Sequence, residues 1–236
     1  MIGVIGGMGP LATVDFMAKV IEVCGAADDA HHVPMLVSCD PRVPGRPAAM
    51  LGGGASPLPA LRAIRDRLVA AGATALVMPC NTAHHWFDGL VDGCPVPFLS
   101  IVEAGCDEAA KASPAGARIA VLATPATLAA RLFDAGLQRR GLVPVAPTPA
   151  ELERWLSPSI AAVKAGRLND ASDLLRGAMQ LMADRGVERF LLACTELPLA
   201  LAAGAEPVPW PCVDTNLALA RVTVAHWQRE LRRGAA

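Results

Sequence analysis

Short aliphatic runs alternate with longer stretches rich in alanine and leucine along almost the whole chain. The aliphatic runs predict strands at residues 2–5, 33–39, 75–79, 118–123 and 189–193. The longer stretches predict helices at residues 11–24, 58–71 and 215–232. They also predict one helix that begins at about residue 82, another that follows the 118–123 strand and ends at residue 137, and two helices within 151–185. This alternation is typical of parallel sheets covered by helices, so we predict an α/β fold. Aromatic residues make up only 4% of the chain, which fits an aliphatic core of that kind.

The chain contains a weak internal repeat. The segment IGVIGGMGPLAT from residue 2 aligns with IAVLATPATLAA from residue 119, an offset of 117 positions. The segment ALVMPCNT from residue 75 aligns with RFLLACTE from residue 189, and the two cysteines in them are 114 positions apart. Strand–turn–helix sequences can also align by chance, so the alignment alone supports a true repeat and a coincidence about equally. If the repeat is real, it predicts two similar α/β halves.

Composition and charge narrow the class of partner and the compartment. The formal net charge is −1 and Lys and Arg form no long run, which argues against a nucleic-acid partner. No stretch is long and apolar enough to cross a membrane. The first ten residues lack a basic region and resemble a strand and turn rather than a signal peptide, so we expect a cytoplasmic protein. Seven cysteines without a C-x-x-C pair suggest core or catalytic thiols in a reducing compartment.

Two of the seven cysteines follow predicted strands in matching contexts. Cys80 and Cys194 each come at the carboxyl end of a buried strand, where ligands bind in open parallel sheets. Asn81, Thr82 and Thr195 come next, where a helix is expected to begin and where backbone N–H groups and hydroxyls can hold a carboxylate. A helix N-terminus also lowers the pKa of a nearby thiol. A lone cysteine after a strand is more often a small core residue, but the matching pair favours catalysis.

A glycine-rich turn and a proline-rich loop follow the first two predicted strands. The turn lacks the spacing of either common phosphate-binding motif, so we interpret it as a tight turn whose backbone, at Met8 and Gly9, approaches a ligand closely. In the loop, Arg46 is pinned by two prolines and a glycine and could hold a carboxylate through two parallel hydrogen bonds. A solvated arginine is as good an interpretation of its position, and Arg42 is a competitor for the role.

Other polar residues are less distinctive. Lys164 is one of only three lysines and follows Arg46 at close to the repeat offset, although a surface lysine is the simpler interpretation. Glu196 could orient a thiol, bind an ammonium group or simply favour a helix N-terminus. His84 and His85 are adjacent, so on a helix they cannot face one metal ion together. No zinc-site spacing occurs, and we predict no metal site.

At these residues the sequence resembles the aspartate/glutamate racemase family. The resemblance is carried by GGMGPLAT from residue 6, MPCNTAH from residue 78 and LACTELP from residue 192, in the family's order and spacing. It implies two pseudo-symmetric parallel-sheet α/β domains with the active site in the cleft between them. We place the domains at residues 1–98 plus 211–236 and at residues 99–210. It also implies no pyridoxal phosphate, no metal ion and a homodimer.

The resemblance assigns roles residue by residue. Cys80 and Cys194 take the two acid/base positions, Arg46 that of a carboxylate-binding arginine, and Lys164 that of a basic residue of the second domain. Positions that line the substrate are matched by Asn81, Thr82, Thr124 and Thr195. The chain departs from the family in its loop, where Gly45 replaces an aspartate and Asp40 an asparagine, and at Ala193, which replaces a glycine. These departures bear on the substrate more than on the reaction.

The expected activity is therefore cofactor-independent racemisation of a small acidic amino acid, aspartate or glutamate. Two bases are needed because a single base would return the proton to the face it came from. Sister activities on the same scaffold stay open, namely a maleate isomerase or a hydantoin racemase. A decarboxylase is less favoured because one cysteine suffices there. A protein that binds an amino acid without turning it over is the alternative from another class.

Overall fold

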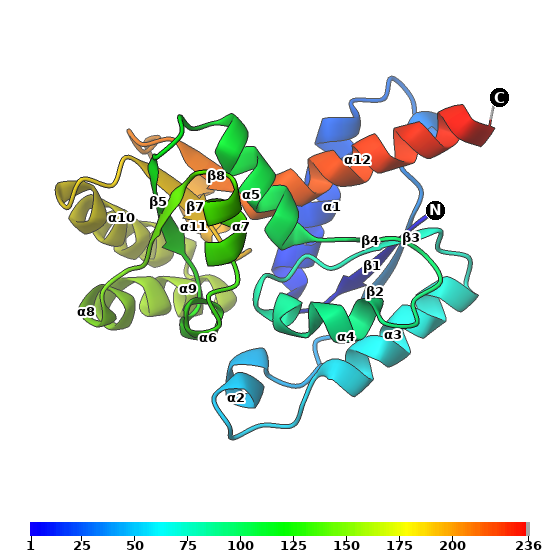
Figure 1. Cartoon of the computed structure of the whole chain (residues 1–236), viewed down its shortest axis with the longest axis horizontal. Coiled ribbons are helices and arrows are strands. Elements are labelled where there is room, and N and C mark those ends of the chain that lie inside the picture. Colours follow the sequence, from blue (N-terminus) through cyan, green and yellow to red (C-terminus); the bar gives the residue numbers. More distant parts are fainter. Residues whose placement is uncertain (235–236) are drawn as a thin grey trace. The chain divides into compact units, whose positions relative to one another are not determined.

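Two four-stranded parallel sheets form the framework of the chain in the computed structural model, which describes residues 1–234 (Figure 1). The first sheet has the order β2-β1-β3-β4 and the second β6-β5-β7-β8, so both follow the same path from strand to strand. The strands are β1 (Ile2–Gly6), β2 (Met35–Cys39), β3 (Ala75–Val77), β4 (Phe98–Leu99), β5 (Arg118–Leu122), β6 (Val143–Val145), β7 (Arg189–Leu192) and β8 (Cys212–Asp214). The predicted fold class is confirmed, and the matching strand orders support a genuine internal repeat.

Helices connect successive strands of each sheet. In the first half of the chain they are α1 (Pro10–Cys24), η1 (Asp29–His31), α2 (Arg46–Met50), α3 (Leu58–Ala70), η2 (Thr82–Trp86) and α4 (Phe87–Val91). The second half has α5 (Ile101–Lys111), α6 (Pro125–Ala129), α7 (Asp134–Arg139), α8 (Pro149–Glu151), the π-helical η3 (Leu152–Leu156), α9 (Ser157–Lys164), α10 (Leu168–Asp184), α11 (Leu197–Ala202) and α12 (Thr215–Gly234). Within the described residues, no helix is both long and apolar enough to cross a membrane.

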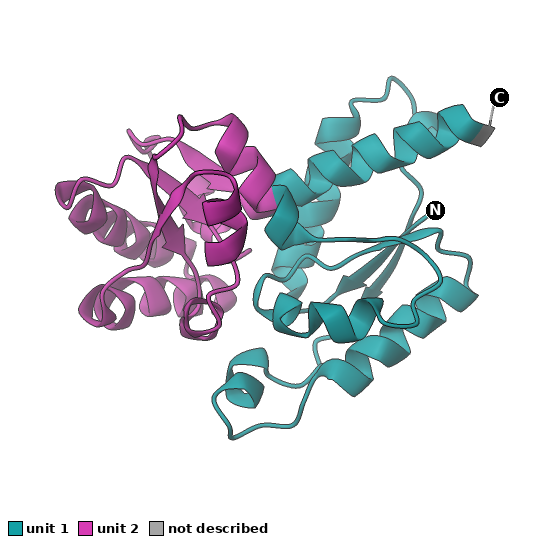
Figure 2. Cartoon of the chain, viewed as in Figure 1, with its two compact units in different colours: residues 1–104, 216–236 teal, residues 105–215 magenta. Residues whose placement is uncertain are grey.

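The chain divides into two compact units (Figure 2). Unit 1 contains residues 1–104 and the chain from 216 onward, and unit 2 contains residues 105–215. The borders therefore fall inside α5 and at the start of α12, a few residues later than the sequence placed them. Ile101 stays in unit 1 because it packs in the same apolar cluster as Leu219 of α12. The strand β8 belongs to unit 2 because it pairs with β7.

In unit 1, helices cover both faces of the sheet. Side chains alternate along each strand, so Ile2 and Val4 face one side of the sheet while Ile5 faces the other. The first side packs on α1 and α12, and the second on α3 (Figure 1). All five residues of β1 are buried, as expected for a central strand of a parallel sheet.

In unit 2, one apolar cluster holds α9, α10 and α11 against the sheet. Leu122 and Leu192 lie side by side on β5 and β7 and are both buried in this cluster. Met179 and Leu175 of α10 supply much of the helical side. The cluster also contains Cys194, which places that cysteine at the border between the core and the end of the sheet.

Several predicted elements differ from those observed. The segment from residue 82 is a 3-10 turn followed by the short α4, not one long helix, and the stretch up to residue 137 contains two short helices. The pair expected within 151–185 corresponds to α9 and α10, with η3 before them. The edge strands β4, β6 and β8 were not predicted, because each has only two or three residues with proline beside or within it, whereas the equally short β3 lies in the aliphatic run ALVM.

Candidate active site

The predicted site residues gather at the carboxyl ends of the strands in each unit. Strand order reverses between β1 and β3 in the first sheet and between β5 and β7 in the second, and ligands of open α/β sheets bind beyond such points. The loops that follow these strands begin at residues 7, 78, 123 and 193. The predicted site residues lie in these loops except Thr82, which begins η2, Arg46, which begins α2, and Lys164, which ends α9. We call Met8, Gly9, Arg46, Cys80, Asn81 and Thr82 the first half-site, and Thr124, Lys164, Cys194, Thr195 and Glu196 the second.

The turn after β1 is held by one threonine. The Gly7 N–H donates to Thr13 Oγ1 at 2.9 Å, and the Thr13 hydroxyl donates to the Gly9 carbonyl at 3.0 Å. Gly7 has φ +93°, and a Cβ there would lie 2.4 Å from the backbone carbon of Asp40. The turn therefore needs glycine on two grounds, its left-handed backbone and its contact with the end of β2. This fixes the backbone of Met8 and Gly9 at the sheet edge.

The two arginines of the proline-rich loop have different partners. Arg42 donates from Nε and Nη2 to the two carboxylate oxygens of Asp40, both at 2.9 Å. These bonds hold the pKa of the Asp40 carboxyl at about 2, below its usual range. Arg46 instead donates from Nη2 to the Met8 carbonyl at 3.2 Å, and from Nη1 to Val43. The structure therefore places Arg46, and not its competitor Arg42, against the turn after β1.

Cys80 lies just past β3 and is 4% exposed. Its side chain belongs to the same apolar cluster as Met8 and Val43, and α2, which begins at Arg46, contacts η2. Asn81 and Thr82 are also buried. The first half-site is thus one connected group of residues. The helix that follows Cys80 is much shorter than predicted, so it offers fewer aligned peptide dipoles to stabilise a thiolate.

In the second half-site, a buried glutamate receives two side-chain hydrogen bonds. The Cys194 thiol donates to Glu196 Oε2 at 3.1 Å, and the Thr195 hydroxyl reaches the same oxygen at 3.3 Å. All three residues are at most 5% exposed. Burial raises the pKa of the Cys194 thiol well above its usual value, and the negative charge of Glu196 adds to this while Lys164 opposes it. Cys194 is therefore a protonated thiol at neutral pH.

Lys164 and Thr124 complete this half-site. Lys164 ends α9, and its Nζ lies 3.9 Å from Glu196 Oε1, with half of its side chain exposed. Of the three interpretations of Glu196, the hydrogen bond from Cys194 fits the one that orients a thiol, and its place at the N-cap of α11 fits the one that favours a helix N-terminus. Thr124 follows β5 and caps α6, where its Oγ1 accepts from the Thr127 N–H at 3.2 Å. Lys164 is thus a half-exposed lysine at a helix end, as the simpler interpretation has it, and the fold also brings it to Glu196.

One residue of the first half-site escaped the sequence analysis. His84 was considered only as a metal ligand, yet it is 6% exposed and its ring contacts the Cys80 carbonyl. Its position four residues after Cys80, on one helical face, was the available signal. Thr13 was also missed, because a threonine within a predicted helix gives no sign that its hydroxyl closes the preceding turn.

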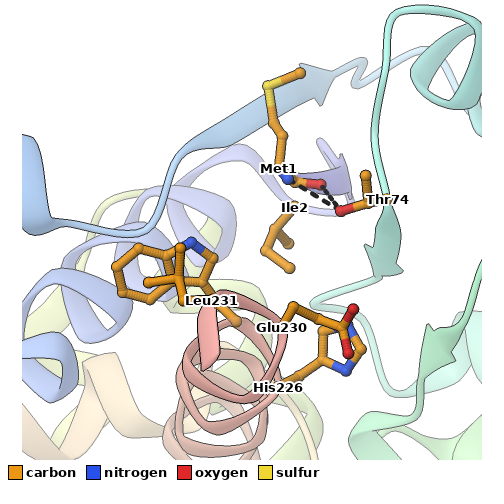
Figure 3. A pocket seen from close by; sticks show the side chains of 7 residues that line it. Met1, Ile2, Thr74, His226, Glu230 and Leu231 are labelled. Atoms are coloured by element: carbon orange, nitrogen blue, oxygen red, sulfur yellow. Dashed lines mark hydrogen bonds between the residues drawn. The ribbon is translucent and has the colours of Figure 1, made fainter. Parts of the chain in front are cut away.

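A pocket of about 380 Å³ lies at the opposite edge of the first sheet (Figure 3). It is lined by Met1 and Ile2 at the start of β1, by Thr74 and by α12 residues that include His226 and Glu230. It holds none of the predicted site residues. Over residues 1–234, no three His, Cys, Asp or Glu side chains gather into a group that could hold a metal ion.

Two parallel α/β units, each with a cysteine just past the third strand of its sheet, define the two-domain racemase fold. The chain belongs to the Asp/Glu/Hydantoin racemase family, whose model matches residues 5–223. Among solved structures it is similar to the aspartate racemase of Picrophilus torridus, with 28% identity, a TM-score of 0.80 and coverage of 95% of this chain and 93% of that one.

Two relatives in sequence extend the comparison. The broad specificity amino-acid racemase RacX of Bacillus subtilis is 27% identical over 95% of this chain and 97% of its own length. The glutamate racemase of Pseudomonas paraeruginosa is 33% identical over 67% of this chain and 59% of its own length. The predicted family is therefore confirmed.

Proposed function

We propose that this chain is a cofactor-independent racemase of an acidic amino acid, with Cys80 and Cys194 as its two acid/base groups. The observation that carries the proposal is the equivalent position of the two cysteines. Each lies just past the third strand of a sheet with the same strand order, at the edge where α/β sheets bind ligands. The hydrogen bond from Cys194 to a buried carboxylate distinguishes it further from an ordinary core thiol.

The reaction moves one proton off the α-carbon and one proton onto it. A thiolate on one side takes the α-proton, so the Cα–H bond breaks and an S–H bond forms. The thiol on the other side gives its proton to the opposite face of the carbanion, and no net oxidation occurs. In the ligand-free protein Cys194 begins as the proton donor, because burial and Glu196 keep it protonated. For the enantiomer whose α-hydrogen faces Cys80, Cys80 is the base and Cys194 the acid, and the roles swap for the other enantiomer.

The carbanion needs its carboxylate held as negative charge grows on it. We assign this task to hydroxyl, amide and backbone N–H groups at Asn81, Thr82 and Thr195, which are buried beside the two cysteines. Thr124 and the backbone of Met8 and Gly9 line the remaining sheet edges. Arg46 and Lys164 supply positive charge for the side-chain carboxylate of the substrate. These assignments give every residue of the two half-sites a role in one reaction.

The substrate need not be limited to aspartate. Gly45 replaces the acidic residue that is usual in the family loop, and the charge of Asp40 is compensated by Arg42. A full-length relative is named a broad specificity racemase. We therefore include neutral amino acids beside aspartate and glutamate in the test.

The test is α-proton exchange in heavy water. The protein is incubated separately with L-aspartate, L-glutamate, L-alanine and maleate, and deuterium at Cα, D-enantiomer and fumarate are followed by NMR and chiral chromatography. Deuterium together with the D-enantiomer of an acidic amino acid supports the proposal. Fumarate from maleate would point to an isomerase, and binding without exchange to a non-catalytic protein.

Cysteine variants test the mechanism. Cys80→Ala and Cys194→Ala should each lose racemisation in both directions, and Cys106→Ala is the control because Cys106 is a buried thiol of α5 whose sulfur faces the Phe133 carbonyl. A Cys80 or Cys194 variant that racemises at the wild-type rate contradicts the two-base mechanism. The homodimer and the cytoplasmic location stay predictions, which light scattering and cell fractionation can check.

A further inference from the structure

His84 occupies a buried place beside Cys80 that the two-base mechanism does not use. It lies on η2, is 6% exposed and stacks on Phe87 with ring centroids 5.1 Å apart. Phe87 in turn meets Phe98 of β4 edge to face at 5.3 Å. The imidazole is thus fixed in its plane by aromatic contacts, and its rotation would need these rings to move.

Both ring nitrogens are engaged by the main chain. The Ile101 N–H, at the start of α5, donates to Nε2 at 3.2 Å. Nε2 is therefore the unprotonated nitrogen, and Nδ1 carries the hydrogen and donates it to the Cys80 carbonyl at 2.9 Å. Burial lowers the pKa of His84 to about 4, so the ring is neutral under physiological conditions.

We propose that His84 is a positioning residue for Cys80, which holds the Cys80 peptide in place by a bond from Nδ1 and is itself anchored through Nε2 to the first residue of α5. This inference rests on the proposed function for the role of Cys80 in catalysis. The Cys80 N–H donates to the Met78 carbonyl at 2.8 Å, so hydrogen bonds hold the peptide groups on both sides of its Cα. With the backbone fixed on both sides, the direction of the Cα–Cβ bond, and hence the reach of Sγ, is fixed.

The same geometry separates His84 from the histidine of a cysteine–histidine catalytic pair. Such a histidine faces the sulfur with one nitrogen and carries a positive charge that stabilises the thiolate. Here both nitrogens face backbone groups and the ring is neutral. His84 therefore acts on where the thiol points and not on its charge. Displacement of a reacting group by about 1 Å typically slows a reaction about 100-fold.

Two substitutions of His84 each keep one of its two hydrogen bonds and remove the other. The amide nitrogen of asparagine is as many bonds from Cβ as Nδ1, so His84→Asn can still donate to the Cys80 carbonyl but cannot reach Ile101. The amide oxygen of glutamine is as many bonds from Cβ as Nε2, so His84→Gln can accept a hydrogen bond from the Ile101 N–H but loses the hydrogen bond to the Cys80 carbonyl. His85 lies next in the chain and is exposed, so His85→Gln is the matched control.

The experiment compares these variants by turnover and by thiol alkylation. We expect His84→Gln to lower kcat about 10- to 100-fold with KM nearly unchanged, and His84→Asn to retain most of kcat. Alkylation of Cys80 by iodoacetamide, followed by mass spectrometry, should be several-fold faster in His84→Gln and close to wild type in His84→Asn. The alkylation of Cys194 should be unchanged in both, and thermal melting shows that each variant is folded.

Equal behaviour of the two variants, whether both wild-type or both impaired, would overturn the positioning role, since a purely space-filling histidine does not distinguish its nitrogens. The alkylation contrast does not depend on any substrate. If no amino acid is turned over by the wild-type protein but the contrast at Cys80 is present, the positioning inference stands and the proposed function fails.

Discussion

The thiol of Cys194 donates to Oε2 of Glu196 at 3.1 Å, and both side chains are buried. The two residues are only two positions apart, in the loop that follows β7, so the contact is set locally by the turn into α11. Lys164 approaches the other carboxylate oxygen from α9, a helix distant in sequence. A buried carboxylate thus lies between a thiol and an ammonium group, and it controls the proton on that thiol.

The charge of Glu196 is expected to hold the Cys194 proton in place. In Glu196→Gln the negative charge is gone, and the pKa of Cys194 should fall, although burial keeps it above the usual value. Alkylation of Cys194 near pH 8 should then become about three- to tenfold faster, which corresponds to a fall of up to about one pKa unit. Glu188→Gln, at an exposed position of the same unit, is the control. An unchanged rate in Glu196→Gln would show that the hydrogen bond does not govern the thiol.

Buried His84 should make the protein sensitive to acid. Its pKa is about 4 in the folded protein and about 6.5 when unfolded, so between these values the unfolded chain binds more protons. The free energy of unfolding should therefore fall as the pH drops from about 6.5 to 4, with a contribution from His84 of about 3 kcal/mol. Urea unfolding across this range should show a clearly smaller fall in His84→Asn, which has no ring to protonate. Equal falls in both proteins would contradict the assignment.

Lys164 should matter for the substrate and little for stability. Its contact with Glu196 is long and half exposed, and such pairs contribute less than about 1 kcal/mol. Lys164→Gln should therefore melt close to wild type, while KM for an acidic substrate rises about tenfold or more through loss of a charge partner worth about 1.4 kcal/mol. Lys111→Gln, at an exposed lysine on α5, should change neither quantity. If KM is unchanged in Lys164→Gln, the substrate carboxylate is held elsewhere.

The two loop arginines should respond differently to the same substitution. Arg46→Lys removes the planar donor set beside the Met8 carbonyl, and kcat/KM should fall about 10- to 100-fold, or about 1.4 to 3 kcal/mol of binding to the transition state. Arg42→Lys only weakens an exposed pair with Asp40 and should stay within about twofold of wild type. Steady-state kinetics with both enantiomers checks this. The reverse order of effects would transfer the role to Arg42.

A pair of glycine substitutions separates backbone strain from close contact. Gly7→Ala forces a Cβ into a left-handed residue and onto the Asp40 backbone 2.4 Å away, whereas Gly52→Ala has φ +91° with nothing within 4 Å. We expect Gly52→Ala to cost about 1 kcal/mol from the backbone alone. Gly7→Ala should cost at least about 2 kcal/mol more, because the strand end must move. Equal losses in the free energy of unfolding would mean that the end of β2 can move away from the turn at little energetic cost.

Much of this organisation was visible in the sequence. The central strands and longer helices follow from hydrophobic periodicity, and the placement of Cys80 and Cys194 at strand ends follows from where those strands stop. The 117-residue offset, read from the strand beginning at Ile2, suggested two similar halves, and the shared strand order of the two sheets supports that suggestion. Such features are local, because they depend on residues near each other in the chain.

Other features were decided only when distant segments came together. The edge strand β8 was not predicted, because the pairing of Cys212 with Phe190 of β7 leaves no trace in so short a run. The choice between Arg42 and Arg46 depended on which guanidinium reaches the turn after β1.

The sequence by itself therefore determined the fold class and the position of the two cysteines at strand ends, since buried strands and their ends are set by the alternation of apolar and polar side chains. Only the tertiary structure decided how those cysteines are supported. The hydrogen bond from the Ile101 N–H to His84 and the approach of Lys164 to Glu196 join residues 17 and 32 positions apart. Directional contacts of this kind depend on distances of a few ångströms between elements, which packing fixes and periodicity does not encode.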